Sequence, residues 1–135
     1  MRLLVAGLLL AALVFGQAGE SVAGQLVSGK LKETAAGPVL VTAQGEVAVT
    51  GDEESNEVLR DQRLEGLQLE GKGHFTDATH FRLDHFHTKP LRVVQQDGVK
   101  KEVTYWCEVC SIRTYTPGKC LCCQEETALD LRVVE

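Results

Sequence analysis

Aromatic residues are scarce in this sequence: four phenylalanines, two tyrosines and one tryptophan among 135 residues. Proteins that hold single-stranded nucleic acid stack successive bases on such side chains. Basic residues are also outnumbered, at 14 against 19 acidic ones, and they never occur in runs of more than two. A net charge of −5 repels a phosphate backbone. We therefore expect no nucleic-acid partner.

Sequence motifs of the common enzyme classes are missing as well. The chain has no phosphate-cradling glycine loop, no metallopeptidase helix and no Ser-His-Asp spacing typical of a hydrolase. This lack favours a non-catalytic protein without excluding an enzyme. Thiol chemistry is the remaining catalytic alternative, because the chain contains five cysteines.

Long hydrophobic runs are missing except at the N-terminus. Arg2 precedes an apolar run over residues 3–15, and a small-x-small pattern follows at residues 16–18. This layout is typical of a secretory signal peptide, and the run is short for a bilayer span. We predict a signal peptide over residues 1–18 and a lead-in over 19–24. The mature protein would be periplasmic or secreted without a stable membrane anchor; an N-terminal buried helix or a retained anchor is the alternative.

Short alternating segments dominate the next part of the chain. Apolar and polar residues alternate imperfectly over 24–33, and two further strands are predicted at 39–42 and 46–50 around a Gln44-Gly45 turn. The acidic start at Asp52 and the arginines at 60 and 63 indicate one short helix within 51–66. Two more strands are predicted within 64–75 and 80–88.

Three strands, a helix and two strands resemble the OB-fold, a five-stranded partly open barrel. The resemblance covers residues 25–88 and depends on element order and glycine placement. It implies a mainly β protein with a small OB-like antiparallel barrel and one short helix. Another small antiparallel barrel or a meander would fit the same pattern.

A hairpin and a cysteine-rich ribbon are predicted after the barrel. Strands at 91–95 and 101–106 flank Asp97-Gly98, which is a strong hairpin turn signal. The second strand leads directly into Cys107. We predict a barrel over residues 25–95, followed over residues 96–135 by a hairpin and a metal-binding ribbon.

Four of the five cysteines follow a spacing that metals favour. Cys107, Cys110, Cys120 and Cys123 form a C-x2-C-x9-C-x2-C pattern, and two such turns can bring four thiolates around one tetrahedral ion. The pattern resembles a zinc ribbon, which implies that these four residues bind Zn²⁺. The glycine that commonly follows each pair is replaced here by Ser111 and Gln124.

Two other interpretations of the cysteines stay open. An exported protein meets oxidising conditions, so two disulfides and one free thiol are the main competitor to a metal. Cys122 adds a fifth thiol that could replace a neighbour as ligand, and a Cys-x-Cys-Cys cluster also suits Cu(I).

Four histidines lie within fourteen residues, at positions 74, 80, 85 and 87. If the strand within 80–88 is regular, His85 and His87 share a face with Phe81 and Leu83. Because this strand leads toward the cysteines, His87 is an alternate metal ligand. Structural or surface roles are the commoner fate of such histidines.

Residues 104–131 also resemble the C-terminal block of a group of short exported bacterial proteins of unknown function. This resemblance implies export and a shared ending, but no reaction. We therefore expect an exported binding or structural module with a zinc site, whose partner is a small ligand or another envelope protein. A thiol-redox or copper-handling envelope protein is the alternative.

Overall fold

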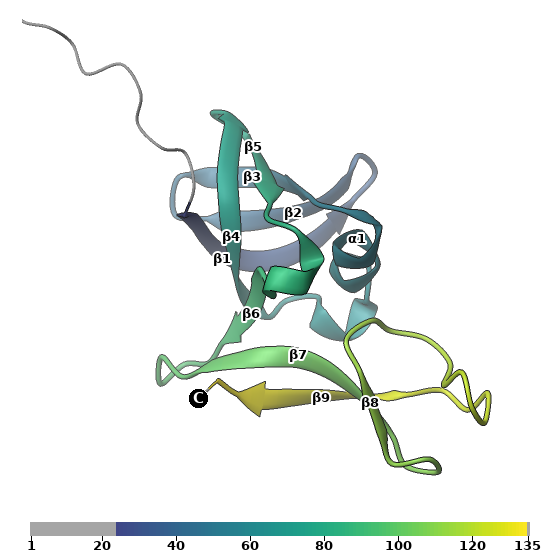
Figure 1. Cartoon of the computed structure of the whole chain (residues 1–135). Coiled ribbons are helices and arrows are strands. Elements are labelled where there is room, and N and C mark those ends of the chain that lie inside the picture. Colours follow the sequence, from purple (N-terminus) through teal and green to yellow (C-terminus); the bar gives the residue numbers. More distant parts are fainter. Residues whose placement is uncertain (1–23, 135) are drawn as a thin grey trace, which may run out of the picture.

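A closed five-stranded barrel forms the first part of the protein (Figure 1). The computed structural model describes residues 24–134, and the predicted signal peptide lies outside them. The strands run β1-β2-β3-β5-β4, and β4 pairs again with β1. They are β1 (Gln25–Thr34), β2 (Gly37–Thr42), β3 (Gly45–Thr50), β4 (Gln68–Asp77) and β5 (His80–Leu83).

The predicted fold class is confirmed. The protein is mainly β, with an OB-like barrel, one α-helix among the described residues and a cysteine cluster near the C-terminus. One detail differs from an all-antiparallel barrel, because β3 and β5 pair in parallel through Ala48 and His80. The helix between β3 and β4 makes this pairing possible, since β3 and β5 are not joined by a hairpin.

The helix begins where the sequence predicts and ends earlier. In α1 (Glu53–Leu59), the Asp52 carboxylate accepts a hydrogen bond from the Ser55 backbone at 3.3 Å and caps the N-terminus. The chain then turns at Arg60 into a separate 3₁₀ turn, η1 (Gln62–Leu64), capped by Asp61. The expected single helix is therefore two short elements.

The histidine segment also differs from the prediction. β5 ends at Leu83, and His85 to Thr88 form the turn η2 (Phe86–Thr88) with its cap, not a strand. The Phe86 amide donates to the Asp52 carboxylate at 2.8 Å, and Lys89 adopts a left-handed backbone with φ 54°. These contacts turn the chain away from β5. His85 and His87 consequently stack on each other, with ring centroids 5.7 Å apart.

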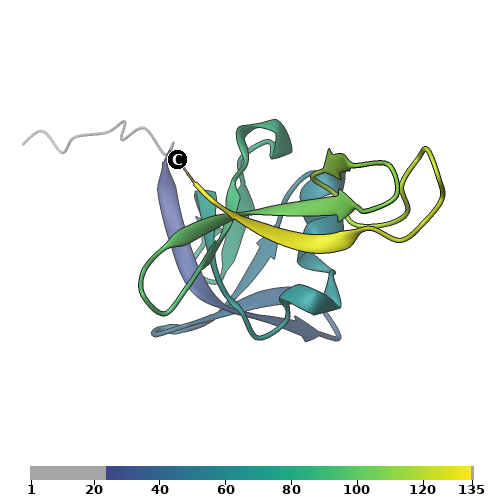
Figure 2. The same cartoon turned by 90° about the horizontal axis from the view of Figure 1, so that it is seen from below.

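The C-terminal part forms a second layer that crosses the barrel (Figure 2). It consists of β6 (Leu91–Val94), β7 (Lys100–Cys107), β8 (Ile112–Thr114) and β9 (Ala128–Val133). β6 pairs with β4 of the barrel, and β7 pairs with β6, β8 and β9. The predicted hairpin around Gly98 is confirmed, whereas β9 was not predicted.

One apolar core joins both layers. Leu40, Leu69 and Phe81 of the barrel are fully buried, and Tyr105 of β7 belongs to the same cluster. A fully buried leucine or phenylalanine contributes about 1.5–3 kcal/mol relative to an exposed one. The second layer is therefore attached to the barrel mainly by burial. Within residues 24–134, no helix has the length and apolar character to cross a bilayer.

Candidate metal centre

The two predicted cysteine turns lie side by side beyond the end of β7. The sulfur atoms of Cys107, Cys110, Cys120 and Cys123 all lie within 4.8 Å of one another. Cys107 Sγ and Cys123 Sγ are 3.5 Å apart. Four thiolates around tetrahedral zinc, with Zn–S bonds near 2.3 Å, would lie about 3.8 Å apart. This cluster could hold a metal ion.

The two turns repeat one local design. Cys107 pairs with Ile112 across the first turn, and the Cys120 amide donates to the Glu125 carbonyl at 2.8 Å across the second. In each turn the residue after the second cysteine is left-handed, with φ 52° at Ser111 and 64° at Gln124. Glycine usually occupies such positions because it carries no Cβ. Ser111 and Gln124 therefore adopt the backbone conformation that glycine usually has in such turns.

Ser111 offers a direct test of this backbone conformation. We expect Ser111→Val to lower the free energy of unfolding by about 1–3 kcal/mol, because a β-branched residue strongly disfavours positive φ. Ser111→Gly should be neutral or slightly stabilising. Both variants should be compared by urea unfolding of the metal-loaded protein, and the position is exposed, so packing changes little. Equal stability of the valine and glycine variants would contradict the left-handed assignment.

The backbone of the second turn favours a thiolate. Amides of Cys123 and Cys122 point at the Cys120 sulfur and lower the pKa of this thiol to about 7. The Cys122 side chain and burial have the opposite effect on Cys110, whose pKa lies well above its usual range. Metal binding requires thiolates. Cys120 thus ionises more easily than Cys110.

Burial distinguishes the members of the cluster. Cys107 and Cys120 are only 1% and 2% exposed, while Cys110 and Cys123 are half-buried. Cys122 is exposed. Among residues 24–134, no other group of three or more acidic, cysteine or histidine side chains converges in this way.

Of the two alternate ligands, Cys122 lies beside the cluster, close to the Cys110 sulfur, and His87 lies in a pocket lining. Cys122 and His87 do not belong to the four-sulfur cluster found in the described part of the chain. His87 lines a pocket beside η2, and His80 is engaged with Asp77 at 2.8 Å. The assignment of Cys107, Cys110, Cys120 and Cys123 as ligands stays a prediction.

A polar network connects this centre with the barrel, and sequence patterns gave no sign of it. The Tyr105 hydroxyl donates to Asp61 at 2.8 Å, and the Arg63 guanidinium contacts the same carboxylate at 3.0 Å. Arg63 also donates to the Thr127 carbonyl at 3.0 Å, just after the second cysteine turn. Thr127 in turn bonds the Gly118 carbonyl through its hydroxyl and its amide. The network positions the base of the cysteine loop against η1.

The pH dependence of stability tests this network. Burial alone would raise the pKa of Asp61, but hydrogen bonds from Arg63 and Tyr105 outweigh it and hold the pKa below its usual 3.8. The ionised form therefore stabilises the fold above that value, and the contribution disappears as the pH falls through the depressed pKa. We expect the free energy of unfolding of wild type to exceed that of Asp61→Asn by about 1–3 kcal/mol at neutral pH. The difference should be smaller below about pH 4. Urea unfolding at several pH values measures the difference, and a constant gap would contradict the assignment.

Comparisons of the chain with protein-family models, curated proteins and solved structures find no match. The resemblance of residues 104–131 to short exported bacterial proteins therefore stays a prediction. The function has to be inferred from the geometry of the described residues.

Proposed function

We propose that the protein is an exported, non-catalytic binding module whose C-terminal ribbon is organised by one structural Zn²⁺. The observation that carries this proposal is the convergence of four sulfur atoms within 4.8 Å from two similar turns. Four protein ligands complete a tetrahedral zinc site and leave no position for a substrate. This arrangement supports a structural role.

The cysteine segment of the ribbon, residues 108–127, buries few side chains. Between residues 108 and 127 the fully buried side chains are Cys120 and Thr127, whereas Val109 and Leu121 are exposed. Ordering a residue costs about 1–2 kcal/mol in backbone entropy. A segment that buries so little apolar surface needs a cross-link, and a metal gathers all four sulfurs at once.

Disulfides are the main alternative cross-link. The 3.5 Å separation of the Cys107 and Cys123 sulfurs makes this pair the natural candidate for a bond between the two turns. We favour zinc because the remaining sulfurs converge on the same point, a feature that disulfide pairing does not require. Two buried thiols in a cluster of four also match a closed zinc site.

Metal analysis and thiol counting separate the two alternatives. The protein should be secreted, purified without chelator, analysed for metals, and alkylated after denaturation without reductant. We expect one zinc per chain and five alkylated cysteines. No metal together with one alkylated cysteine would overturn the zinc proposal in favour of two disulfides.

Copper or thiol-redox chemistry is the second candidate function. It is favoured by one observation, the exposed Cys122 beside Cys120 and near the sulfur of Cys110. A fifth thiolate at the surface could accept Cu(I) from a donor. Competition between Zn²⁺ and Cu(I) in wild type and Cys122→Ser tests this, since a carrier should lose copper uptake in the variant and a structural zinc site should not change.

Export is the part of the proposal that depends on residues outside the described range. The basic, apolar and small-residue order of residues 1–18 supports it. We expect the secreted chain to begin near Gly19, which intact mass measures directly. A secreted chain that still begins at Met1 would contradict signal cleavage. A small ligand or another envelope protein is the proposed partner.

A further inference from the structure

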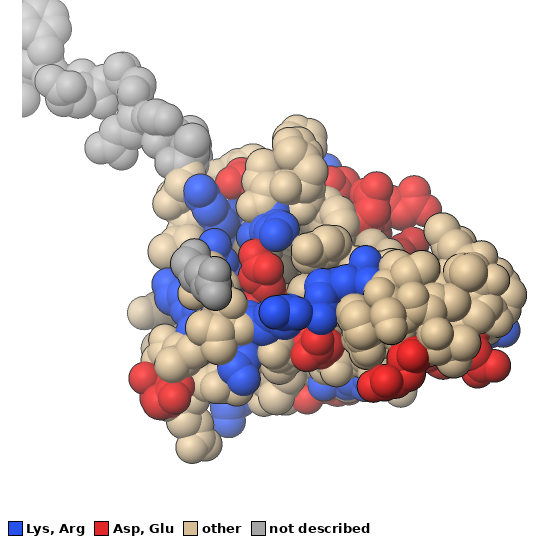
Figure 3. All heavy atoms as spheres, turned by 60° about the horizontal axis from the view of Figure 1, so that its bottom comes forward, with Lys and Arg blue, Asp and Glu red and all other residues tan. Residues whose placement is uncertain are grey.

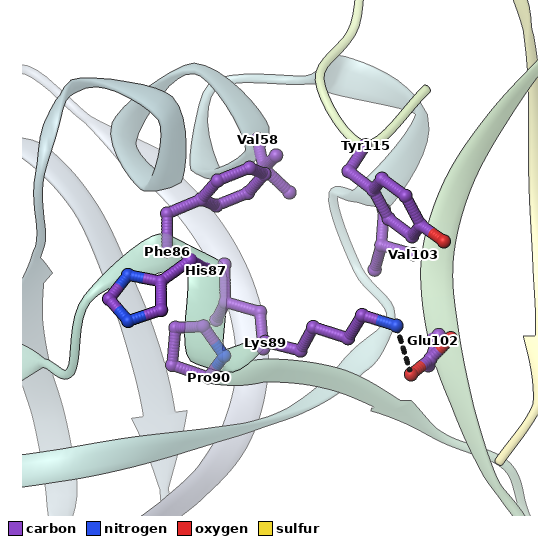
Figure 4. A pocket seen from close by; sticks show the side chains of 9 residues that line it. Val58, Phe86, His87, Lys89, Pro90, Glu102, Val103 and Tyr115 are labelled. Atoms are coloured by element: carbon purple, nitrogen blue, oxygen red, sulfur yellow. Dashed lines mark ion pairs between the residues drawn. The ribbon is translucent and has the colours of Figure 1, made fainter. Parts of the chain in front are cut away.

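A pocket of about 220 Å³ lies between the barrel and the C-terminal layer (Figure 4). Its wall on the barrel side comes from α1 and the η2 turn, and its opposite wall comes from β7 and the segment after β8. Val58, Phe86, Pro90, Leu91, Val103 and Tyr115 supply most of the lining. The pocket therefore exists only where the two layers meet.

The two charged residues of this pocket are paired with each other, and His87 lies on the opposite side (Figure 4). Lys89 extends along its edge and forms an ion pair with Glu102 at 3.2 Å (Figure 4). The Lys89 ammonium also lies 4.9 Å from the centre of the Tyr115 ring. The backbone that presents this lysine is left-handed, with φ 54°. Such strained positions are frequent where a side chain must be aimed at a ligand.

A second hollow, of about 340 Å³, shares Lys89 and Pro90 with this pocket. Lys72, Lys89, Arg92 and Lys100 line it together with a single carboxylate, Glu70. Four positive charges against one give a local excess of three, in a chain whose net charge is −5. Figure 3 shows lysine and arginine side chains gathered around carboxylates on the face that carries β7 and β9.

Two of these cations form no close ion pair with a carboxylate of the described residues. Glu70 pairs with Lys100 at 3.0 Å and Glu102 pairs with Lys89. Within residues 24–134, neither Lys72 nor Arg92 forms an ion pair with a carboxylate. An apolar pocket therefore adjoins, through Lys89 and Pro90, a surface on which cations outnumber carboxylates.

We propose that the two hollows form one binding site for a small amphipathic carboxylate, such as a medium-chain fatty acid. The apolar chain fills the pocket between the layers, and the carboxylate lies against Lys89 and Arg92. A volume of 220 Å³ is about seven times the share of one water molecule in the liquid, which gives room for about seven groups of that size. The inference rests on the proposed binding role but not on the identity of the metal.

Existing ion pairs do not prevent this binding. The side chains of Lys89 and Glu102 are 47% and 24% exposed, and exposed ion pairs contribute little because water and salt screen them. The Lys89 ammonium has three donors, so it can bind a ligand carboxylate while it stays paired with Glu102. Arg92 adds a planar fork of donors that suits a carboxylate.

Octanoate, octanol and acetate test the site together. Titration of the metal-loaded secreted protein, followed by amide chemical shifts, should show saturable octanoate binding with changes at Phe86, Lys89 and Tyr115. Octanol should bind at least tenfold more weakly because it lacks the charge, and acetate should not saturate because it lacks the chain. No saturation by octanoate below its micelle concentration would overturn the proposal.

Two variants test whether the cations bind the carboxylate end of the ligand. Arg92→Gln and Lys89→Gln should each weaken octanoate binding at least fivefold and leave octanol binding unchanged. Arg82→Gln, an exposed position on β5, is the matched control and should bind as wild type does. Unchanged octanoate affinity in both pocket variants would refute the role of the cations.

Zinc content and thermal midpoint, measured on the same samples, show which proposal fails. A zinc-loaded, folded wild type that ignores octanoate contradicts the ligand site alone. A chain that lacks zinc and has two disulfides, yet binds octanoate, contradicts the metal proposal alone.

Discussion

Cys107→Ser is expected to abolish metal retention and to unfold the ribbon while the barrel stays folded. Cys107 is 1% exposed and ends β7, so its sulfur fixes the cluster to the central strand of the second layer. Apparent zinc-binding energies of such sites are about 10–16 kcal/mol, and this energy is also folding energy. Hydrogen exchange should show lost protection over residues 107–127. The metal content should fall from one equivalent per chain to near zero.

Cys122→Ser is the matched control, because it removes an exposed thiol from the same segment. We expect one equivalent of metal and unchanged protection in this variant. If it loses the ion while Cys123→Ser keeps it, the ligand assignment is wrong. Native protein that carries no metal, resists chelator and unfolds with reductant would show that disulfides hold the ribbon.

The barrel should survive loss of the metal because its contacts with β7 are independent of the cysteines. Tyr105 is fully buried in the common core and donates to Asp61. The segment after β8 is different, since Tyr115 is 39% exposed and lies between the two cysteine turns. We infer that metal loss would release this wall of the pocket before it disturbs the barrel, so octanoate binding should also weaken.

The barrel could be predicted from sequence because its signals are local. Alternation in β1 and β3, the glycine turn before β3 and the acidic cap at Asp52 each specify an element without reference to distant residues. The cysteine cluster was predictable for the same reason, since ligand spacing is a property of short turns. These features need no knowledge of tertiary packing.

Features that depend on tertiary contacts were missed. A regular strand was expected through His85, but the hydrogen bond from Phe86 to Asp52, 34 residues earlier, turns the chain instead. β9, which pairs with β7, was also missed, although Leu129, Leu131 and Val133 alternate there with polar residues. The pocket combines Val58, Phe86 and Tyr115, which are far apart in the sequence and share no motif.

The left-handed backbone at Ser111 and Gln124 lies between these cases. The turn spacing predicted the place, but the residue types argued against the conformation because neither is glycine. Convergence of four sulfurs at one point requires both turns to close in this way. The cysteine cluster thus holds Ser111 and Gln124 in a backbone conformation that their residue types disfavour. Such strained residues accompany functional centres more often than ordinary loops.

Gly73→Ala is expected to lower the free energy of unfolding by at least about 3 kcal/mol, because the position combines overpacking with backbone contact. Gly73 of β4 pairs with Gln25 of β1 on one side and Leu83 of β5 on the other, where the barrel closes. A Cβ built there would overlap the carbonyl oxygen of Arg82 and lie 2.9 Å from the Leu83 Cα. Because both obstacles are backbone atoms, no rotamer change can relieve the clash.

Gly66→Ala separates this steric effect from ordinary glycine strain. Gly66 has φ 82°, and a Cβ there meets no atom within 4 Å, so the change should cost only about 1–2 kcal/mol for the left-handed backbone. Urea unfolding measures both variants, and metal content should stay at one equivalent wherever the protein remains folded. Equal losses of unfolding free energy would mean that Gly73 is needed for its backbone conformation and not for the close approach of β4 and β5. A much larger loss at Gly73 would show that the barrel closes only because β4 passes β5 without a side chain between them.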